Sequence, residues 1–168
     1  MAGARFVIDV DDEAVLAALR HAASGLSQPG PLMADIAEYL YTSTRARFNT
    51  QTDPDGVAWP ALHPRYAETK PKNKAKILTL SGEMRGPRLF PQASDTEAAV
   101  VSNAIQARIH NLGGVIRPKN GRALRIGGTG KLVGAVRIPR RQFMGLSDAD
   151  SQEIIDLTLD YIGQPFTD

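Results

Sequence analysis

Apolar residues recur at helical spacing in three stretches of the chain. The first follows the acidic run 11–13 and ends at the Pro/Gly break 28–31, and its apolar stripe consists of Val15, Leu16, Leu19, Ala22, Ala23 and Leu26. A longer helix is predicted over about 32–48, with one face made of Met33, Ile36, Ala37, Leu40, Thr44 and Phe48. The third is predicted over about 148–162 and begins with an acidic turn. The first two helices are expected to pack together and to cover a sheet.

Several shorter stretches have the pattern of β-strands. Residues 5–10 alternate in the way of a half-buried strand, and 98–102 form a run typical of a buried one. Further strands are expected around 88–92 and over 132–138, where Pro139 ends the ladder because proline has no N–H to donate. A short helix is predicted over 104–112 and is closed by two glycines, which permit a left-handed cap.

Two segments have the composition of loops within a single domain of 168 residues. Residues 49–76 are rich in Pro, Asp, Gly and Lys, and a turn is predicted at Asp53-Pro54-Asp55-Gly56. Trp59 and Leu62 are expected to anchor this loop, 64–69 to form one helical turn, and the lysines at 70, 72, 74 and 76 to be solvated and mobile. Residues 113–134 hold seven of the fifteen glycines among Lys and Arg, which predicts a β-hairpin or a long flexible loop.

The net charge of +2 conceals a strong segregation of charge along the chain. Residues 1–59 hold four Lys/Arg and eight Asp/Glu, residues 60–141 hold sixteen and four, and residues 142–168 hold none and six. The balances of −4, +12 and −6 fit three readings: neutralisation within the chain, head-to-tail contacts between copies in a ring, or a basic surface that faces nucleic acid. With no cysteine, no signal-peptide pattern and no apolar run of membrane-spanning length, the protein is expected to be made in the host cytoplasm without membrane contact.

No group of residues has the spacing of a catalytic, cofactor or metal site. Gly127-Gly128-Thr129-Gly130-Lys131 lacks the first glycine of a phosphate-binding loop, and Leu132 stands where such a loop needs Ser or Thr. His21, His63 and His110 lie on separate elements without ligand spacing, and Ser81 lacks the context of a nucleophile. The sequence therefore predicts a protein that is not an enzyme and that uses no cofactor or metal.

Four short blocks occur in a fixed order along the chain: Arg47-Phe48 with Asp53-Pro54-Asp55-Gly56 and Trp59-Pro60-Ala61-Leu62, then Leu80-Ser81-Gly82-Glu83-Met84-Arg85, then Ile109-His110-Asn111-Leu112-Gly113-Gly114, and Ile138-Pro139-Arg140-Arg141-Gln142-Phe143-Met144-Gly145-Leu146. In this order they resemble the phage virion morphogenesis family, whose members complete tails and help to join heads to tails in Mu-like and related temperate phages. The resemblance covers about 44–146, and it lacks the tyrosine that precedes the third block in the family. Gln142 and Met144 stand where the family commonly has proline and leucine.

The resemblance implies a small α+β protein in which amphipathic helices pack on an antiparallel sheet. It also implies a non-catalytic role in a ring, six-fold or twelve-fold, in the virion at the head–tail junction or the upper end of the tail. Other neck, connector or tail proteins would be its partners, and packaged DNA could be touched only through phosphates. The interface candidates are Trp59, Arg85, His110, Arg140, Arg141 and Phe143.

Two alternatives stay open from the residues themselves. Arg140, Arg141 and Phe143 fit either an interface anchor or a tight turn with Phe143 in the core and Arg141 bonded to carbonyls. Trp59 fits a core anchor better than a contact residue. The competing function is a basic nucleic-acid-binding module, which the sixteen cations of 60–141 favour. Aromatic residues are only 6% of the chain and are not interleaved with the basic ones, as a stacking platform would require.

Overall fold

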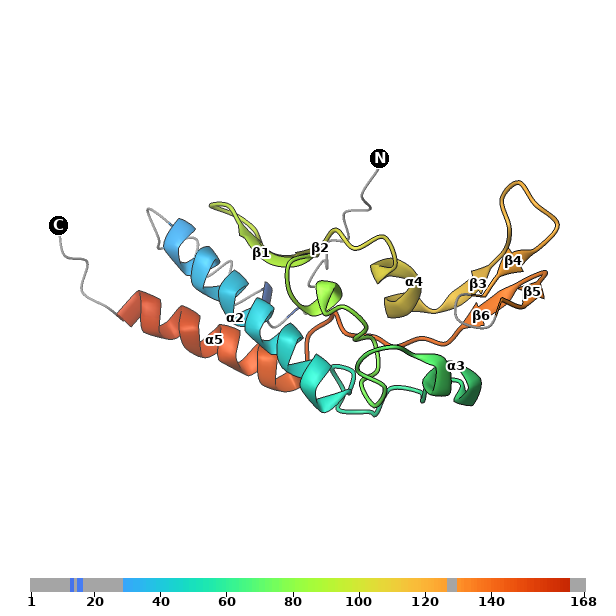
Figure 1. Ribbon diagram of the computed structural model, residues 1–168. Helices are drawn as coiled ribbons and strands as arrows, with labels where there is room; N and C mark the ends of the chain where they lie inside the picture. The colour runs from blue at the N-terminus through green and yellow to red at the C-terminus, as the bar shows by residue number, and fades with distance from the viewer. Residues whose placement is uncertain (1–12, 14, 17–28, 127–129, 164–168) are drawn as a thin grey trace.

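The computed structural model describes residues 13, 15, 16, 29–126 and 130–163. The predicted strand at 5–10 and most of the first predicted helix lie outside these residues, although 13, 15 and 16 are helical and Val15 is buried. The described elements are α2 (Gly30–Thr50), α3 (Pro64–Thr69), η1 (Glu83–Arg85), β1 (Leu89–Ala93), β2 (Ala98–Ser102), α4 (Ala107–Leu112), β3 (Gly114–Ile116), β4 (Leu124–Arg125), β5 (Leu132–Val133), β6 (Val136–Ile138) and α5 (Asp148–Gly163). Their arrangement is an elongated α+β fold (Figure 1).

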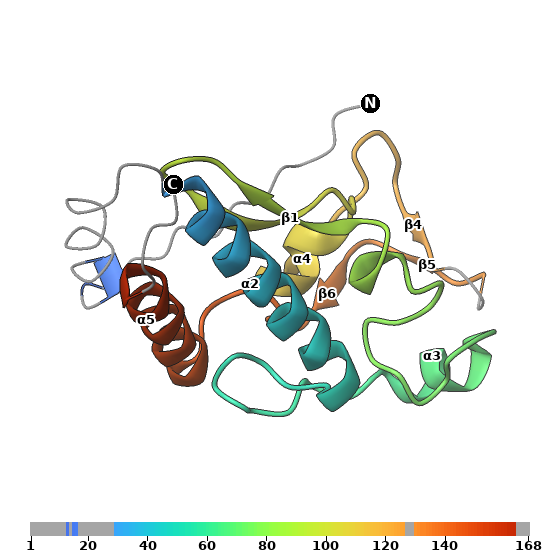
Figure 2. The same ribbon diagram turned by 90° about the vertical axis from the view of Figure 1, so that its left-hand side faces the viewer.

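Helix α2 is the central element of the fold. It begins at the Pro29 and Pro31 break and ends at Gln51, whose left-handed backbone (φ 60°) turns the chain away while its N–H bonds to the carbonyl of Arg47. The predicted apolar face is confirmed, because all six of its residues are buried. This face packs on β1 and β2, and α5 lies alongside the helix (Figure 2).

The described strands form three separate antiparallel pairs. β1 pairs with β2, β3 with β6, and β4 with β5. The first pair confirms the strands predicted around 88–92 and over 98–102, and its register places Leu89 opposite Ser102. The predicted strand 132–138 is instead divided at Gly134 into β5 and β6, and β6 ends before Pro139 as expected. The short helix begins at Ala107, three residues later than predicted.

The two outer pairs form a projection that we call the arm, residues 114–138. β3 and β6 form its base and β4 and β5 continue it outward, away from α2 and α5 (Figure 1). Among the described residues, α2 packs extensively against β1, β2 and α5, whereas each strand of the arm packs chiefly against its own partner strand. An isolated two-stranded ribbon of this kind is marginally stable in water, so a binding partner would stabilise it.

The segment between α2 and β1 departs from the prediction at one lysine. The predicted turn is present, since Gly56 has φ +78° and donates its N–H to the carbonyl of Asp53, and the helical turn is α3. Lys70, however, is only 2% exposed, so the prediction that it is solvated is wrong. Its ammonium donates to the carbonyls of Asn73 and Lys76, and burial lowers its pKa. These two carbonyls supply the acceptors that a buried ammonium needs.

Candidate functional site

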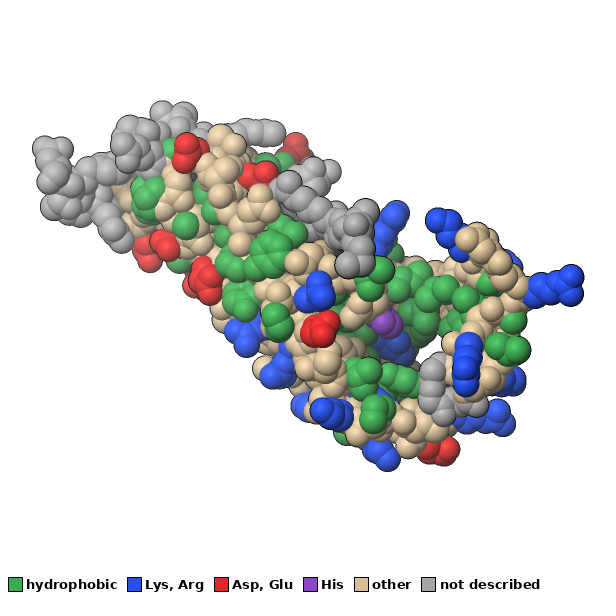
Figure 3. All heavy atoms as spheres, turned by 45° about the horizontal axis from the view of Figure 1, so that its top comes forward, with side chains coloured by type: hydrophobic (Ala, Val, Ile, Leu, Met, Phe, Trp, Pro, Cys, Tyr) green, Lys and Arg blue, Asp and Glu red, His purple; other side chains and the backbone are tan. Residues whose placement is uncertain are grey.

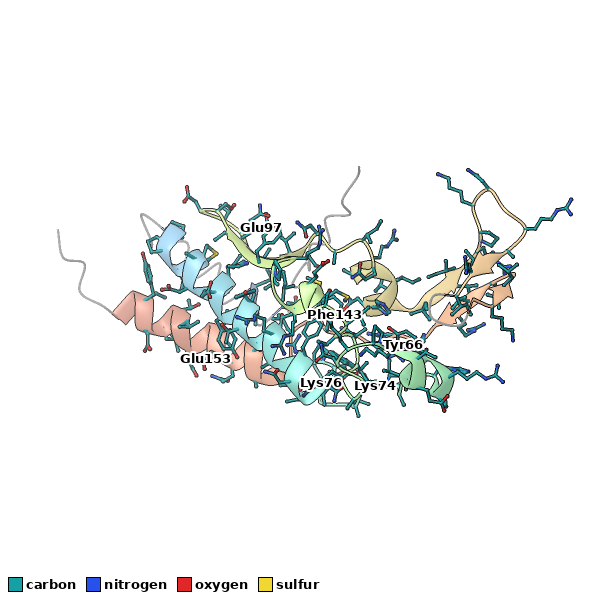
Figure 4. All side chains as sticks on the ribbon, in the orientation of Figure 1. Tyr66, Lys74, Lys76, Glu97, Phe143 and Glu153 are labelled. Carbon is teal, nitrogen blue, oxygen red and sulfur yellow. The ribbon has the colours of Figure 1, made fainter. Side chains whose placement is uncertain are left out.

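Three aromatic rings mark the place where the first, third and fourth sequence blocks meet. The rings of Phe48 and Trp59 have centroids 5.6 Å apart in an edge-to-face arrangement, and those of Phe48 and Phe143 are 5.2 Å apart. The indole Nε1 of Trp59 donates to the carbonyl of Gln142 at 2.8 Å. Figure 4 shows Phe143 in the middle of the molecule, between α2 and the entrance of the arm. We call this region the junction: the end of α2, the loop 51–62, α4 and the segment 139–147.

A buried ion pair lies beside these rings. Arg47, on the buried face of α2, bonds to the carboxylate of Asp150 in the first turn of α5, and their side chains are 7% and 2% exposed. The Arg47 guanidinium also donates to the carbonyls of Phe143 at 3.1 Å and Gly145 at 2.7 Å. One cation therefore joins α2, α5 and the segment between the arm and α5.

Hydroxyl groups complete the shell around Asp150. Its carboxylate accepts hydrogen bonds from Ser43, from Tyr39 at 3.2 Å, and from both the N–H and the hydroxyl of Ser147, at 2.8 and 2.7 Å. Ser147 in return accepts from the Asp150 N–H at 3.1 Å, which caps α5. The buried charge is thus satisfied on all sides, as an interior carboxylate requires.

The pKa shifts follow from this environment. Burial raises the pKa of Asp150, but hydrogen bonds from Ser43 and Ser147 and the charge of Arg47 outweigh burial and hold it below its usual value. Burial lowers the pKa of Arg47, against the opposing attraction of Asp150. Burial and the neighbouring carboxylate raise the pKa of Tyr39 to about 12. The pair is ionised at neutral pH.

The third block contributes Asn111, whose side chain holds the chain after the arm. Its Oδ1 accepts from the backbone N–H groups of both Phe143 and Met144 at 2.9 Å, in the interior. The carbonyl of the preceding residue, His110, accepts from the N–H of Arg141 at 2.8 Å. Burial, followed by the charge of Arg141, lowers the pKa of the His110 imidazole, so the ring is neutral at pH 7.

Arg141 and two glycines complete the junction. The Arg141 guanidinium donates to the carbonyls of Pro60 at 2.7 Å and Ala61 at 2.8 Å, and burial lowers its pKa. Gly113 has φ +72°, and a Cβ there would lie 2.8 Å from the backbone nitrogen of Arg140. Gly145 has φ +143°, and a Cβ there would lie 3.0 Å from Pro54. These glycines are required where two chain segments touch.

The structure distributes the six predicted interface residues between the interior and the surface. Trp59, Arg141 and Phe143 are buried within the junction, as the core alternative for them anticipated. His110 is half-buried at the end of α4, and Arg85 is half-buried with its guanidinium 3.1 Å from the Asn49 side chain. Arg140 is exposed and bonds to the side chain of Gln142. A role of these residues in contacts between subunits stays a prediction.

Sequence reasoning missed the partners that organise the junction. Arg47 was part of the first block, but Asp150 and Asn111 were given no role of their own. One signal was present: Arg47 falls on the same stripe as Leu40 and Thr44, and an arginine on a buried helix face needs an anion. In the junction, charged and amide side chains bond to backbone groups and to one another, so the arrangement is that of a structural clamp.

The arm is rich in cations, whereas helix α5, toward the opposite end of the molecule, is rich in acidic residues. The arm carries six cations and no acidic residue: Arg117, Lys119, Arg122, Arg125, Lys131 and Arg137. Helix α5 carries five acidic residues and no cation, and those exposed are Asp148, Glu153, Asp156 and Asp160. Figure 3 shows the blue side chains of the arm at one end and red ones grouped in the opposite half.

The described part of the chain lacks two other kinds of site. Within 13, 15, 16, 29–126 and 130–163, no group of three or more His, Cys, Asp and Glu side chains could hold a metal ion. In the same part of the chain, no helix is long and apolar enough to cross a bilayer.

Comparison with known proteins gives a single answer. No curated protein and no solved structure matches the chain. The sequence model of the phage virion morphogenesis family matches residues 10–163, which is most of the chain and includes the junction, the arm and α5. The chain therefore belongs to the phage virion morphogenesis family.

Proposed function

We propose that this protein is a non-enzymatic structural protein of a phage, which acts in tail completion and head–tail joining as a subunit of a ring. The ring would sit at the neck or at the upper end of the tail, against neck, connector or tail proteins. Family membership supports a part in virion assembly. The observation that carries the ring is the separation of a cationic arm from an acidic helix at opposite ends of one elongated subunit.

The cationic arm and the acidic helix support a ring because of what a ring of identical subunits requires. Each copy must present two different and complementary patches, because the contact from one subunit to the next is head-to-tail. A patch that was the same on both subunits would close a dimer instead. Opposite charge on the two patches would also steer subunits into the correct orientation during assembly.

Electron microscopy of lysates from the parent phage, with this gene disrupted, tests the proposal. We expect full heads separated from tails, with tails that look finished or abnormally long, and infectious particles restored by the gene supplied from a plasmid. Infectious particles of normal appearance without the gene would refute a structural role.

A nucleic-acid-binding module is the second candidate, and one observation favours it: the arm has six cations and no anion. Its test is the binding of duplex DNA at several salt concentrations. A module of this kind loses affinity steeply as salt rises, because each neutralised phosphate releases counterions. Affinity for DNA that is absent even at low salt would remove this candidate.

A further inference from the structure

The arm leaves part of its apolar surface uncovered within the subunit. Val115 is 43% exposed, Ile116 39% and Leu132 66%. In β3 and β6, Val115 lies directly opposite Arg137, and in β5 and β4, Leu132 lies directly opposite Arg125. Side chains of directly opposed residues lie on the same face of a ribbon. Each pair of strands therefore presents an apolar side chain next to a cation.

Helix α5 has a surface with the same organisation and the opposite charge. Its exposed residues lie on one side of the helix, most of them spaced three or four positions apart: Asp148, Ala149, Gln152, Glu153, Asp156, Leu159, Asp160 and Ile162. Leu159 is 62% exposed and lies one turn after Asp156, so an apolar side chain again has a charged neighbour. The opposite face, with Ile154 and Thr158, is buried toward the fold.

We propose that the arm of one copy docks on this outer face of α5 of the next copy. The apolar residues Val115 and Leu132 pack against Leu159, and Arg125 and Arg137 pair with the carboxylates along α5. The inference rests on the proposed ring and assigns its repeating contact. The arm cannot make this contact with its own α5, because the two lie at opposite ends of the subunit in both views (Figures 1 and 2).

The composition of the arm favours a protein partner over DNA. Phosphates would pair with the six cations, but they would leave Val115 and Leu132 exposed to water. An acidic helix with an exposed leucine covers both kinds of side chain. Because the next copy carries such a helix, the occupant that fits the arm is a second copy of this chain.

Cross-linking between introduced cysteines tests the contact, and the chain offers a clean background because it has no cysteine. Leu132→Cys and Leu159→Cys variants are purified separately with tags of different size, mixed at high concentration and treated with a bis-maleimide. Such a reagent tolerates a range of separations, whereas a disulfide needs Cα atoms within about 7 Å. Val57→Cys, at a loop residue that is 61% exposed, is the matched control in place of Leu132→Cys.

The expected product is a cross-linked pair that contains one subunit of each tag, formed by Leu132→Cys with Leu159→Cys and at least about tenfold less with the Val57→Cys control. Cross-linking of Leu132→Cys with itself to the same extent would indicate an arm-to-arm contact and overturn the inference. Equal cross-linking of the control, or no cross-linking at any concentration, would overturn it as well.

Charge reversal provides an independent measurement. The double variant Arg125→Glu/Arg137→Glu and the double variant Glu153→Lys/Asp156→Lys are each expected to weaken self-association by about tenfold or more in sedimentation, and their mixture to restore it. Charge reversal in the arm that leaves self-association intact and abolishes binding to duplex DNA would assign the arm to DNA instead.

These outcomes are distinct from failure of the proposed function. A gene-disrupted phage with separated heads and tails would support that function even if the contact between the arm and α5 were rejected.

Discussion

Replacement of Arg47 or Asp150 is the most direct test of the junction. Arg47→Met keeps an unbranched apolar stem and removes the charged guanidinium, and Asp150→Asn keeps the shape of the carboxylate and removes its charge. Each single change leaves the other residue as an unpaired charge in the interior, where the two side chains are 7% and 2% exposed. The double variant Arg47→Met/Asp150→Asn combines the same two changes and leaves no buried charge.

The size of the effect follows from the contacts. Removing one partner of a buried ion pair costs about 3–5 kcal/mol of folding free energy. Arg47→Met also removes the hydrogen bonds to the carbonyls of Phe143 and Gly145, so its cost is expected near the upper end. The double variant is expected to cost less than the sum of the two single variants by about 1–3 kcal/mol, because the residues are in direct contact.

Urea unfolding measures these differences well in this protein. Trp59 is the only tryptophan and sits in the junction, so its fluorescence reports unfolding of this region, and far-ultraviolet circular dichroism reports the helices. In thermal unfolding followed by the same two signals, the single variants of a chain of this size should lower Tm by about 6–20 °C. Single variants that each cost less than about 1 kcal/mol, or a double variant whose cost is the simple sum, would refute the reasoning.

Acid titration gives the same prediction a second readout. Because the folded-state pKa of Asp150 is lowered, its contribution to stability is present above the unfolded value of about 3.9 and is lost as the pH falls below it, through the folded pKa. Between pH 7 and pH 3, the wild-type protein should therefore lose more stability than Asp150→Asn. A loss of equal size in both would indicate that other carboxylates cause the acid sensitivity.

Three further changes probe the remaining contacts of the junction by the same unfolding assay. Gly113→Ala should cost about 1–3 kcal/mol, because it places a Cβ 2.8 Å from the Arg140 nitrogen at a positive φ, whereas Gly134→Ala, with no atom within 4 Å, should change stability by less than about 0.5 kcal/mol. Asn111→Ala should cost about 2–4 kcal/mol, because it leaves two buried backbone N–H groups without their acceptor. Trp59→Phe should cost about 1 kcal/mol for the lost indole hydrogen bond, and circular dichroism must replace fluorescence as the readout.

Local patterns in the sequence were sufficient for the elements that depend on local signals. The apolar stripe on α2, its proline-marked start and the run at 98–102 are properties of neighbouring residues, so the helix and β2 were predictable. The division of 132–138 at Gly134 was not, because a glycine within a strand pattern does not by itself distinguish a kink from a continuous strand.

The contacts that organise the junction join residues that are, for example, 32 or 103 positions apart, and a single sequence carries no record of such proximity. Arg47 and Asp150 are each ordinary in their local context, on a helix and in an acidic first turn. Lys70 was predicted to be exposed because lysine usually is, and only the path of the chain around its ammonium reverses that expectation. The resemblance to the family located the four blocks but not the bonds among them.

The junction also determines how the two proposed docking surfaces are related. The arm ends at Ile138 and α5 begins at Asp148, and the segment between them is held at successive points: Arg141 by carbonyls of the loop, Phe143 by Asn111, and Gly145 by Arg47. A short connection held in this way fixes the direction of the arm relative to α5. In a head-to-tail ring, that direction sets the rotation from one subunit to the next and hence whether the ring closes. On the proposed contact, the buried residues of the first, third and fourth blocks would contribute to assembly without touching a partner, by fixing the geometry between the arm and α5.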